Sequence, residues 1–168
     1  TNLELIFGKK EIIPGTSLRV KAVLHDQTGD QINSTVFLTI KSSLDKIIEQ
    51  KEVNTDEFLD YPIKFNEPPA EWKVFAASNK LTAEDKFKIN EKESVDVEII
   101  NKTISVTNTG NVLYNKTLLI KVGDTPLNIQ VTLDVGEIKK YRLSAPNGEY
   151  KVSVITGDEN GIDEMMSL

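Results

Sequence analysis

The chain has 168 residues but no cysteine and a single histidine, His25. Without cysteine it lacks disulfides, thiolate metal ligands and cysteine nucleophiles. A zinc site needs three or four His or Cys ligands in all but rare cases, so one histidine is too few. A Ser–His–Asp triad would have to use His25, which stands beside the turn Asp26–Asp30 with no nucleophile motif nearby. We therefore interpret His25 as a surface residue and expect no catalytic residue and no metal site.

Long apolar runs, glycine-rich loops and excess positive charge are missing as well. No apolar run is longer than five residues, whereas a helix that crosses a bilayer needs about 20, so we expect no membrane insertion by these residues. No strand–GxGxxG–helix pattern occurs, so we expect no nucleotide cofactor. The net charge of −6 repels phosphate backbones, so nucleic acid is not an expected partner. None of the acidic residues lies inside an apolar stretch, and we interpret them as solvated rather than as a glycosidase pair.

What the chain does have is alternation, because apolar residues recur at every second position. The alternating stretches are Leu18–Leu24, Val36–Ile40, Leu59–Phe65, Val95–Ile99, Leu127–Leu133 and Tyr150–Val154. A period of two places one set of side chains on one face of a strand and indicates antiparallel sheets that are wet on the other face. Turn signals separate the stretches: Pro14-Gly15, Thr28-Gly29-Asp30, Pro68-Pro69, Thr109-Gly110-Asn111, Val122-Gly123-Asp124, Val135-Gly136-Glu137 and Asn147-Gly148.

The pattern predicts an all-β chain of two consecutive Ig-like antiparallel β-sandwich domains. We expect strands near 3–7, 17–25, 34–41, 46–53, 57–65, 71–78 and 82–89, then near 94–101, 103–108, 112–122, 127–134, 137–144 and 149–156. The polar segment Asn90–Ser94 is expected to be a short linker. The predicted domains are residues 1–90 and 91–157, followed by an acidic tail or linker at 158–168.

One segment also fits a helix. Ser42–Lys51 has a Ser followed three residues later by Asp45, which is a helix-start signal. We favour a strand over Lys46–Val53, because the first domain needs seven strands to close.

The second domain resembles a known class through particular motifs. Residues 104–111 read ISVTNTGN and residues 133–154 read LDVGEIKKYRLSAPNGEYKVSV. These motifs are similar to those of the CARDB and NEW3 class of Ig-like domains, which occur in archaeal and bacterial surface proteins. The resemblance covers roughly residues 95–156. Its matching residues have structural roles, so the resemblance implies no catalytic set.

The first domain looks like the Ig-like or macroglobulin-type domains of large prokaryotic surface proteins. The resemblance is carried by residues 14–40 and by 71–89, which read EWKVFAASNKLTAEDKFKI. Thioester chemistry is not implied, because the cysteine that it needs is absent. We expect Trp72 to lie in the core, as one Trp often does in a sandwich. The alternative for Trp72 is an exposed ring on which a sugar stacks.

Two further features are candidate modification or metal sites. Sequons occur at Asn33, Asn101 and Asn115, and we expect them to be candidate glycosylation sites of a surface protein. The segment Gly157–Glu164 offers oxygen ligands that would suit calcium, but its spacing does not fit an EF-hand loop. We therefore interpret Gly157–Glu164 as part of the tail and not as a metal site.

Together these patterns imply a non-enzymatic extracellular structural, spacer or adhesion module of a secreted or cell-surface protein, of archaeal type and without cofactors. Because the chain begins at Thr1 and not at Met, we expect a longer precursor with a signal sequence and a membrane anchor outside these residues. Its partner would be a protein or a glycan, bound through loops 26–33, 66–71 and 109–115 or through a sheet edge. The alternatives are a carbohydrate- or cell-wall-binding module and an accessory domain of a larger secreted enzyme.

Overall fold

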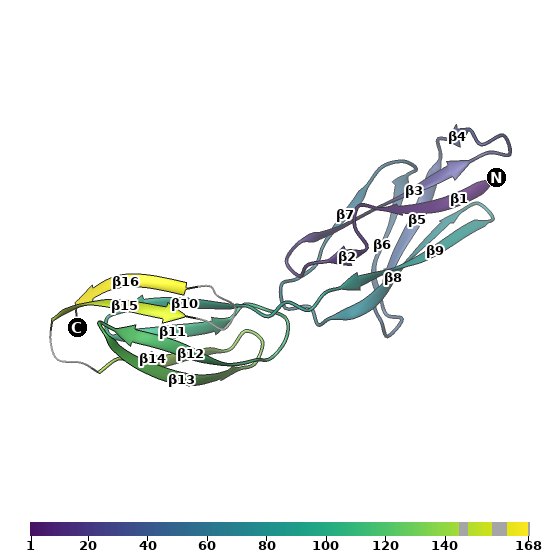
Figure 1. Cartoon of the computed structure of the whole chain (residues 1–168). Helices are drawn as coiled ribbons and strands as arrows, with labels where there is room; N and C mark the ends of the chain where they lie inside the picture. Colours follow the sequence, from purple (N-terminus) through teal and green to yellow (C-terminus); the bar gives the residue numbers. More distant parts are fainter. Residues whose placement is uncertain (145–147, 156–160, 168) are drawn as a thin grey trace. The chain divides into compact units, whose positions relative to one another are not determined.

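The computed structural model describes residues 1–144 and 148–155, and the backbone of residues 161–167 (Figure 1). All regular elements in these ranges are strands, as the alternation predicts. The described residues form no helix that is long and apolar enough to cross a membrane. The chain divides into two compact units, unit 1 (Thr1–Glu91) and unit 2 (Lys92–Leu168).

The first sheet of unit 1 is built around β3 (Ser17–His25). On one side β3 pairs with β1 (Asn2–Phe7). On the other side it pairs with β4 (Gln31–Ile32) near its end and with β7 (Leu59–Pro62) near its start. All three pairings are antiparallel.

The second sheet of unit 1 has the order β2-β9-β8-β5-β6. Its strands are β2 (Glu11–Ile12), β9 (Leu81–Ile89), β8 (Ala70–Ser78), β5 (Thr35–Lys41) and β6 (Ile47–Asn54). The segment that also fits a helix therefore contains the start of β6, and the favoured strand is confirmed. β2 runs parallel to β9, whereas the other neighbours are antiparallel.

The interior of unit 1 lies between its two sheets and follows the period of two. From β3, Leu18, Val20, Ala22 and Leu24 are buried, and from β5, Val36, Leu38 and Ile40. Trp72 is only 4% exposed, so its predicted place in the core is confirmed. Its ring meets the ring of Phe87 edge-on at a centroid distance of 6.0 Å. Such a contact fixes the ring orientation in addition to burying its area.

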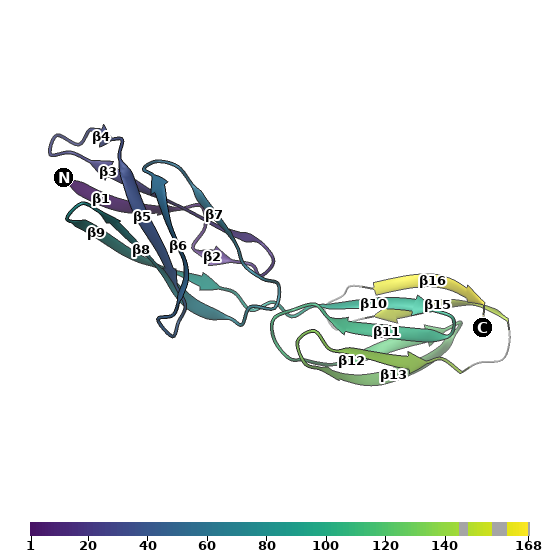
Figure 2. The same ribbon diagram turned by 180° about the vertical axis from the view of Figure 1, so that it is seen from behind.

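Unit 2 also consists of two sheets, and all its pairings are antiparallel (Figure 2). The first has the order β10-β11-β14, formed by Val95–Ile100, Thr103–Asn108 and Ile138–Arg142. The second has the order β13-β12-β15-β16, formed by Thr125–Leu133, Tyr114–Val122, Glu149–Ile155 and Gly161–Ser167. Side chains from both sheets fill the interior, among them Ile104, Val106, Leu118, Ile120, Val152 and Val154.

The C-terminal segment differs from the expected tail. Within residues 158–168, Gly161–Ser167 forms β16, which pairs with β15 over seven residues. The alternation predicts no strand there, because polar and acidic residues interrupt it. The Asn147 position of the expected Asn147-Gly148 turn lies outside the described residues, as do positions 157–160 of the calcium candidate.

A buried amide holds the connection between β11 and β12. Asn108 is 1% exposed. Its Nδ2 donates to the carbonyl oxygens of Val112 at 2.9 Å and Leu133 at 3.0 Å, and its Oδ1 accepts from the amide N–H of Gly110 at 2.9 Å. A buried polar side chain costs free energy unless it is satisfied in this way. Asn108 thus joins its own turn to the end of β13.

The same turn holds the segment through which the chain enters unit 2. The amide N–H of Lys92 donates to Oδ1 of Asn111 at 2.7 Å, and the amide N–H groups of Thr109 and Gly110 donate to the carbonyl of Ser94 at 3.0 and 3.2 Å. The amide N–H of Asn90 donates instead to the carbonyl of Ile12 in unit 1, at 2.9 Å. The expected linker Asn90–Ser94 is therefore largely hydrogen bonded within one unit or the other.

Gly110 is needed because two stretches of backbone approach each other closely. A Cβ atom at this position would lie 2.1 Å from the carbonyl oxygen of Lys92 and 2.9 Å from the amide nitrogen of Ser94. Both contacts are with backbone atoms, so a flexible side chain cannot move aside to relieve them. The NTGN motif therefore needs Gly at position 110, because any Cβ atom there would clash with backbone atoms.

The first prediction concerns Gly110→Ala. We expect it to destabilise unit 2 by about 3 kcal/mol or more, because overpacking against fixed backbone has no easy relief. Urea unfolding followed by far-UV circular dichroism reports both units, whereas fluorescence of Trp72, the only Trp, reports unit 1. The midpoint of the unit 2 transition should move to a lower urea concentration. The midpoint of the transition reported by Trp72 should not change.

The control is Gly136→Ala. A Cβ at position 136 meets nothing within 4 Å. The only cost is the strain of an Ala held at the φ of +79°, roughly 1–2 kcal/mol. An effect of Gly110→Ala no larger than that of Gly136→Ala would contradict the steric account.

Candidate interaction surfaces

A surface hollow of about 430 Å³ lies between the edge strand β6 and the segment that leads into β7. Lys51, Glu52 and Asn54 line one side and are exposed, and Phe58 and Asp60 line the other. The hollow is therefore a shallow depression with charged walls, not an enclosed pocket of the kind that buries a small ligand.

A second hollow adjoins the first and shares Thr35, Asn54 and Glu57 with it. Its base is held by the buried Thr55, whose Oγ1 donates to the carbonyl of Ile32 at 3.2 Å and accepts from the amide N–H of Ser34 at 3.0 Å. These two hydrogen bonds fix the backbone of Ile32 and Ser34 next to the hollow.

Phe58 is at the centre of a cluster of charges on the outer face of the first sheet of unit 1. The guanidinium carbon of Arg19 lies 4.3 Å from the ring centroid and Nζ of Lys21 lies 4.9 Å from it. Arg19 Nε also donates to Asp60 Oδ1 at 2.9 Å, and Lys21 Nζ donates to Asp56 Oδ1 at 2.8 Å. The hydrogen bond from Lys21 lowers the pKa of Asp56. Both cations therefore have an aromatic and an acidic partner within the chain.

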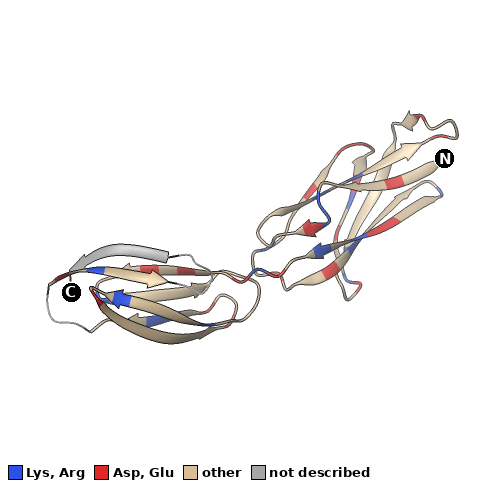
Figure 3. Ribbon diagram, viewed as in Figure 1, with Lys and Arg blue, Asp and Glu red and all other residues tan. Residues whose placement is uncertain are grey.

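Acidic and basic residues lie on neighbouring strands of the second sheet of unit 1 (Figure 3). Lys73 lies 3.8 Å from Glu84, and Lys86 lies 3.5 Å from Glu71. Opposite charges are thus neighbours on adjacent strands, which stabilises a sheet modestly.

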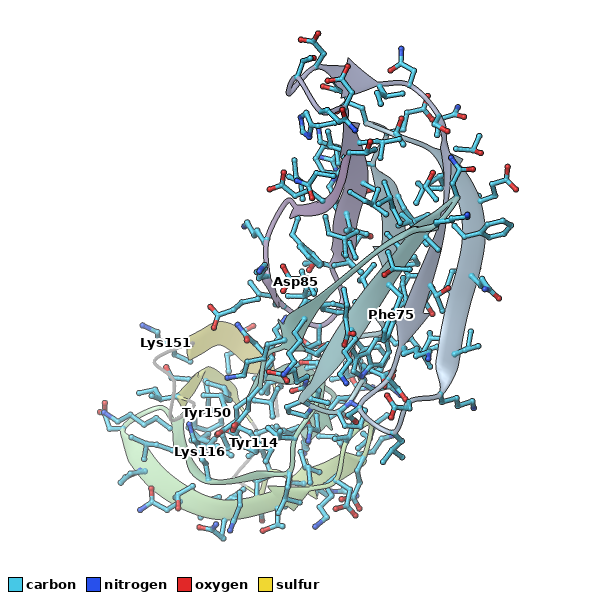
Figure 4. The ribbon with its side chains drawn as sticks, turned by 90° about the vertical axis from the view of Figure 1, so that its right-hand side faces the viewer. Phe75, Asp85, Tyr114, Lys116, Tyr150 and Lys151 are labelled. Atoms are coloured by element: carbon cyan, nitrogen blue, oxygen red, sulfur yellow. The ribbon has the colours of Figure 1, made fainter. Side chains whose placement is uncertain are left out.

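At the edge of this sheet, Lys10 Nζ donates to Asp85 Oδ2 at 2.7 Å, and this hydrogen bond lowers the pKa of Asp85. Phe75 lies on the same sheet as Asp85 (Figure 4). Nζ of Lys41 lies 4.6 Å from the ring centroid of Phe75. The cations at both positions have a partner within the chain.

His25 lies at the end of β3, half-buried, with Asn2 and Gln31 as its strand neighbours. The following loop is a closed turn, since Asp26 Oδ1 accepts from the amide N–H and Oγ1 of Thr28 and from the amide N–H of Asp30, at 2.6–3.0 Å. The hydrogen bond from the Thr28 hydroxyl is the main cause of the lowered pKa of Asp26. Among the described residues, no three His, Cys, Asp or Glu side chains come together as metal ligands.

The three sequon asparagines are all exposed. Asn101 has a φ of +47° in the turn between β10 and β11. Asn115 lies on β12, where its Oδ1 accepts from Gln130 Nε2 at 2.7 Å and from Thr132 Oγ1 at 3.0 Å. Glycosylation of Asn33, Asn101 and Asn115 stays a prediction.

The three loops expected to form a recognition surface differ in availability. Loops 26–33 and 66–71 are mostly exposed. In loop 109–115, Asn111 and Tyr114 are buried and the turn bonds the backbone of Lys92 and Ser94. That loop is therefore largely used inside unit 2, where only Leu113 and Asn115 are exposed, and recognition through the three loops stays a prediction.

No family model matches the chain, and no curated protein has a matching sequence. Solved structures do match. A segment of two fibronectin type III domains from chicken tenascin is 15% identical, with 98% of each chain covered and a TM-score of 0.51. Trypsin-activated α2-macroglobulin from Escherichia coli is 11% identical, with 98% of this chain and 15% of that chain covered and a TM-score of 0.48.

The likeness to the tenascin segment concerns the fold, and it spans both units. The chain therefore consists of consecutive Ig-like β-sandwich domains, and the predicted fold class is confirmed. The resemblance of residues 95–156 to the CARDB and NEW3 class stays a prediction.

The second prediction concerns pH. A carboxyl group whose pKa is lowered by folding adds stability above its ordinary pKa of 3.8, and this is lost as the pH falls through the lowered value. We expect Asp85→Asn to lower the free energy of unfolding of unit 1 by about 0.2–1 kcal/mol at pH 7, since the pair is partly exposed and screened. Below the lowered pKa, the variant and the wild type should be equally stable.

Urea unfolding followed by Trp72 fluorescence at several pH values measures this difference. Glu4→Gln is the control, because the side chain of Glu4 is exposed and forms no hydrogen bond or ion pair with the described residues. A stability difference between Asp85→Asn and wild type that persists unchanged in acid would show that the Lys10–Asp85 pair is not its source.

Proposed function

We propose that the chain is a non-enzymatic structural module, of the spacer or adhesion type, in an extracellular or cell-surface protein. The tandem sandwich fold supports this proposal, because such domains join end to end and present their loops and outer faces to solvent. Independent folding of residues 1–90 and of the domain that follows them, β16 included, belongs to the same proposal. So does a kinship of the second domain with the CARDB and NEW3 class of archaeal and bacterial surface proteins.

The observation that carries the proposal is the parallel pairing of β2 with β9 in unit 1. The amide N–H of Lys88 donates to the carbonyl of Lys10 at 2.7 Å, and that of Asn90 donates to the carbonyl of Ile12 at 2.9 Å. β2 lies near the start of the unit and β9 ends it. A force that pulls the two ends apart therefore slides these parallel strands past each other.

Sliding loads the hydrogen bonds between β2 and β9 together, whereas peeling would break them one after another. A structure loaded in this way resists a larger force than its equilibrium stability alone indicates. In unit 2, the first strand β10 and the described last strand β16 belong to different sheets. We therefore expect unit 1 to be the stronger of the two under tension.

The third prediction is a test by single-molecule pulling on the whole chain. Lys88→Pro removes the amide donor that faces Lys10, so it should reduce the unfolding force of unit 1. Loss of one hydrogen bond should cost about 0.5–1.5 kcal/mol at equilibrium, more if the proline ring strains β9.

The matched control is Ile40→Val in the same unit. It removes one buried methylene from the core and costs about 0.5–1.5 kcal/mol, and Ile40 lies on β5, outside β2 and β9. We expect Ile40→Val to keep most of the unfolding force. If unit 1 is no stronger than unit 2 in the wild type, or if both variants weaken it in proportion to their equilibrium cost, the load-bearing role is wrong.

A further inference from the structure

The outer face of the sheet β10-β11-β14 sorts its side chains by charge. The strand register aligns them in three rows: Asp96, Thr107, Ile138; Glu98, Ser105, Lys140; and Ile100, Thr103, Arg142. β10 thus contributes an acidic column, β14 a basic column, and β11 a column of hydroxyl side chains between them. Every acidic and basic member is exposed, as are Ile100 at 61% and Ile138 at 57%.

This arrangement is the reverse of that in unit 1. There, opposite charges are close neighbours and form ion pairs, as Arg19 does with Asp60. In unit 2 the two charged columns are two strand spacings apart, about 10 Å. None of the four charged residues forms an ion pair or side-chain hydrogen bond with another described residue. Their charges are therefore available to a surface outside the chain.

The face is complementary to itself in one orientation. A two-fold axis along β11 places the acidic column of one copy over the basic column of the other, row by row. Glu98 then meets the partner's Lys140, and Arg142 can lay its aliphatic stem on the partner's Ile100. A two-fold axis across the strands would place acid over acid and is disfavoured.

We propose that this face binds the same face of a second copy of the chain, with the two-fold axis along β11. Three strands of five or six residues offer only about 300 Å² per copy, well below the roughly 800 Å² of a standard interface. The contact is accordingly weak and sensitive to salt, and it gains strength where many copies are held close together. The proposal does not depend on the load-bearing role of unit 1.

The test is a charge swap, read by sedimentation velocity from micromolar to millimolar concentration at low ionic strength. The wild type should show a sedimentation coefficient that rises with concentration. The variant Asp96→Lys/Glu98→Lys and the variant Lys140→Glu/Arg142→Glu should each lose this rise, because like charges then face each other. An equimolar mixture of the two variants should regain it.

The fourfold variant, which combines these substitutions, keeps the net charge of −6 with the columns exchanged. It should associate with itself as well as the wild type does. Raising the ionic strength from about 0.1 M to about 1 M shortens the screening length from about 10 Å to about 3 Å and should weaken wild-type association several-fold.

The matched control is Lys86→Glu/Lys88→Glu, which makes the same charge change on the outer face of unit 1 and should leave the association unchanged. Far-UV circular dichroism of each variant checks that it is folded. A wild type that stays monomeric throughout would overturn the proposal. So would association that survives Lys140→Glu/Arg142→Glu, or a fourfold variant that fails to associate.

Discussion

Burial of one face of each strand is the constraint on which the rest of this structure depends. In β3 and β5 every second side chain, from Leu18 to Ile40, is almost fully enclosed between two sheets. Burying a side chain of this size contributes about 1.5–3 kcal/mol, whereas the intervening positions contribute little to the interior. The outer faces are consequently left to charged and polar residues, and each unit differs from the other mainly in how it arranges them.

The alternation that predicted the strands is a local signal, which is why it succeeded for β3, β5 and β11 and placed Trp72 correctly. Pairing between strands is not local. Nothing near Glu11 and Ile12 indicates that they run parallel to β9, because that pairing depends on residues 77 positions away. β16 was missed for a different reason, since acidic residues interrupt its pattern. The charged columns of unit 2 were also hidden, because only the register of three strands reveals them.

The NTGN motif shows how a resemblance acquires a physical explanation. Its residues were interpreted as structural, and their contacts give the reason. Asn108 satisfies three backbone groups inside unit 2, and Gly110 lets the backbone of Lys92 approach to a distance that a Cβ would forbid. The motif therefore determines where the chain enters unit 2. Unit 1 has no counterpart and is closed at its end by the bonds between β2 and β9 instead.

The claim that each unit has its own interior is tested most directly by native-state hydrogen exchange on Leu38→Ala. Leu38 is fully buried in unit 1, and the substitution should cost about 2–5 kcal/mol there. If the interiors are separate, exchange should accelerate at amides of β5, β8 and β9 and remain unchanged at those of β11, β12 and β15. Equal acceleration in both units would show that one cooperative interior holds the chain together and would contradict this account.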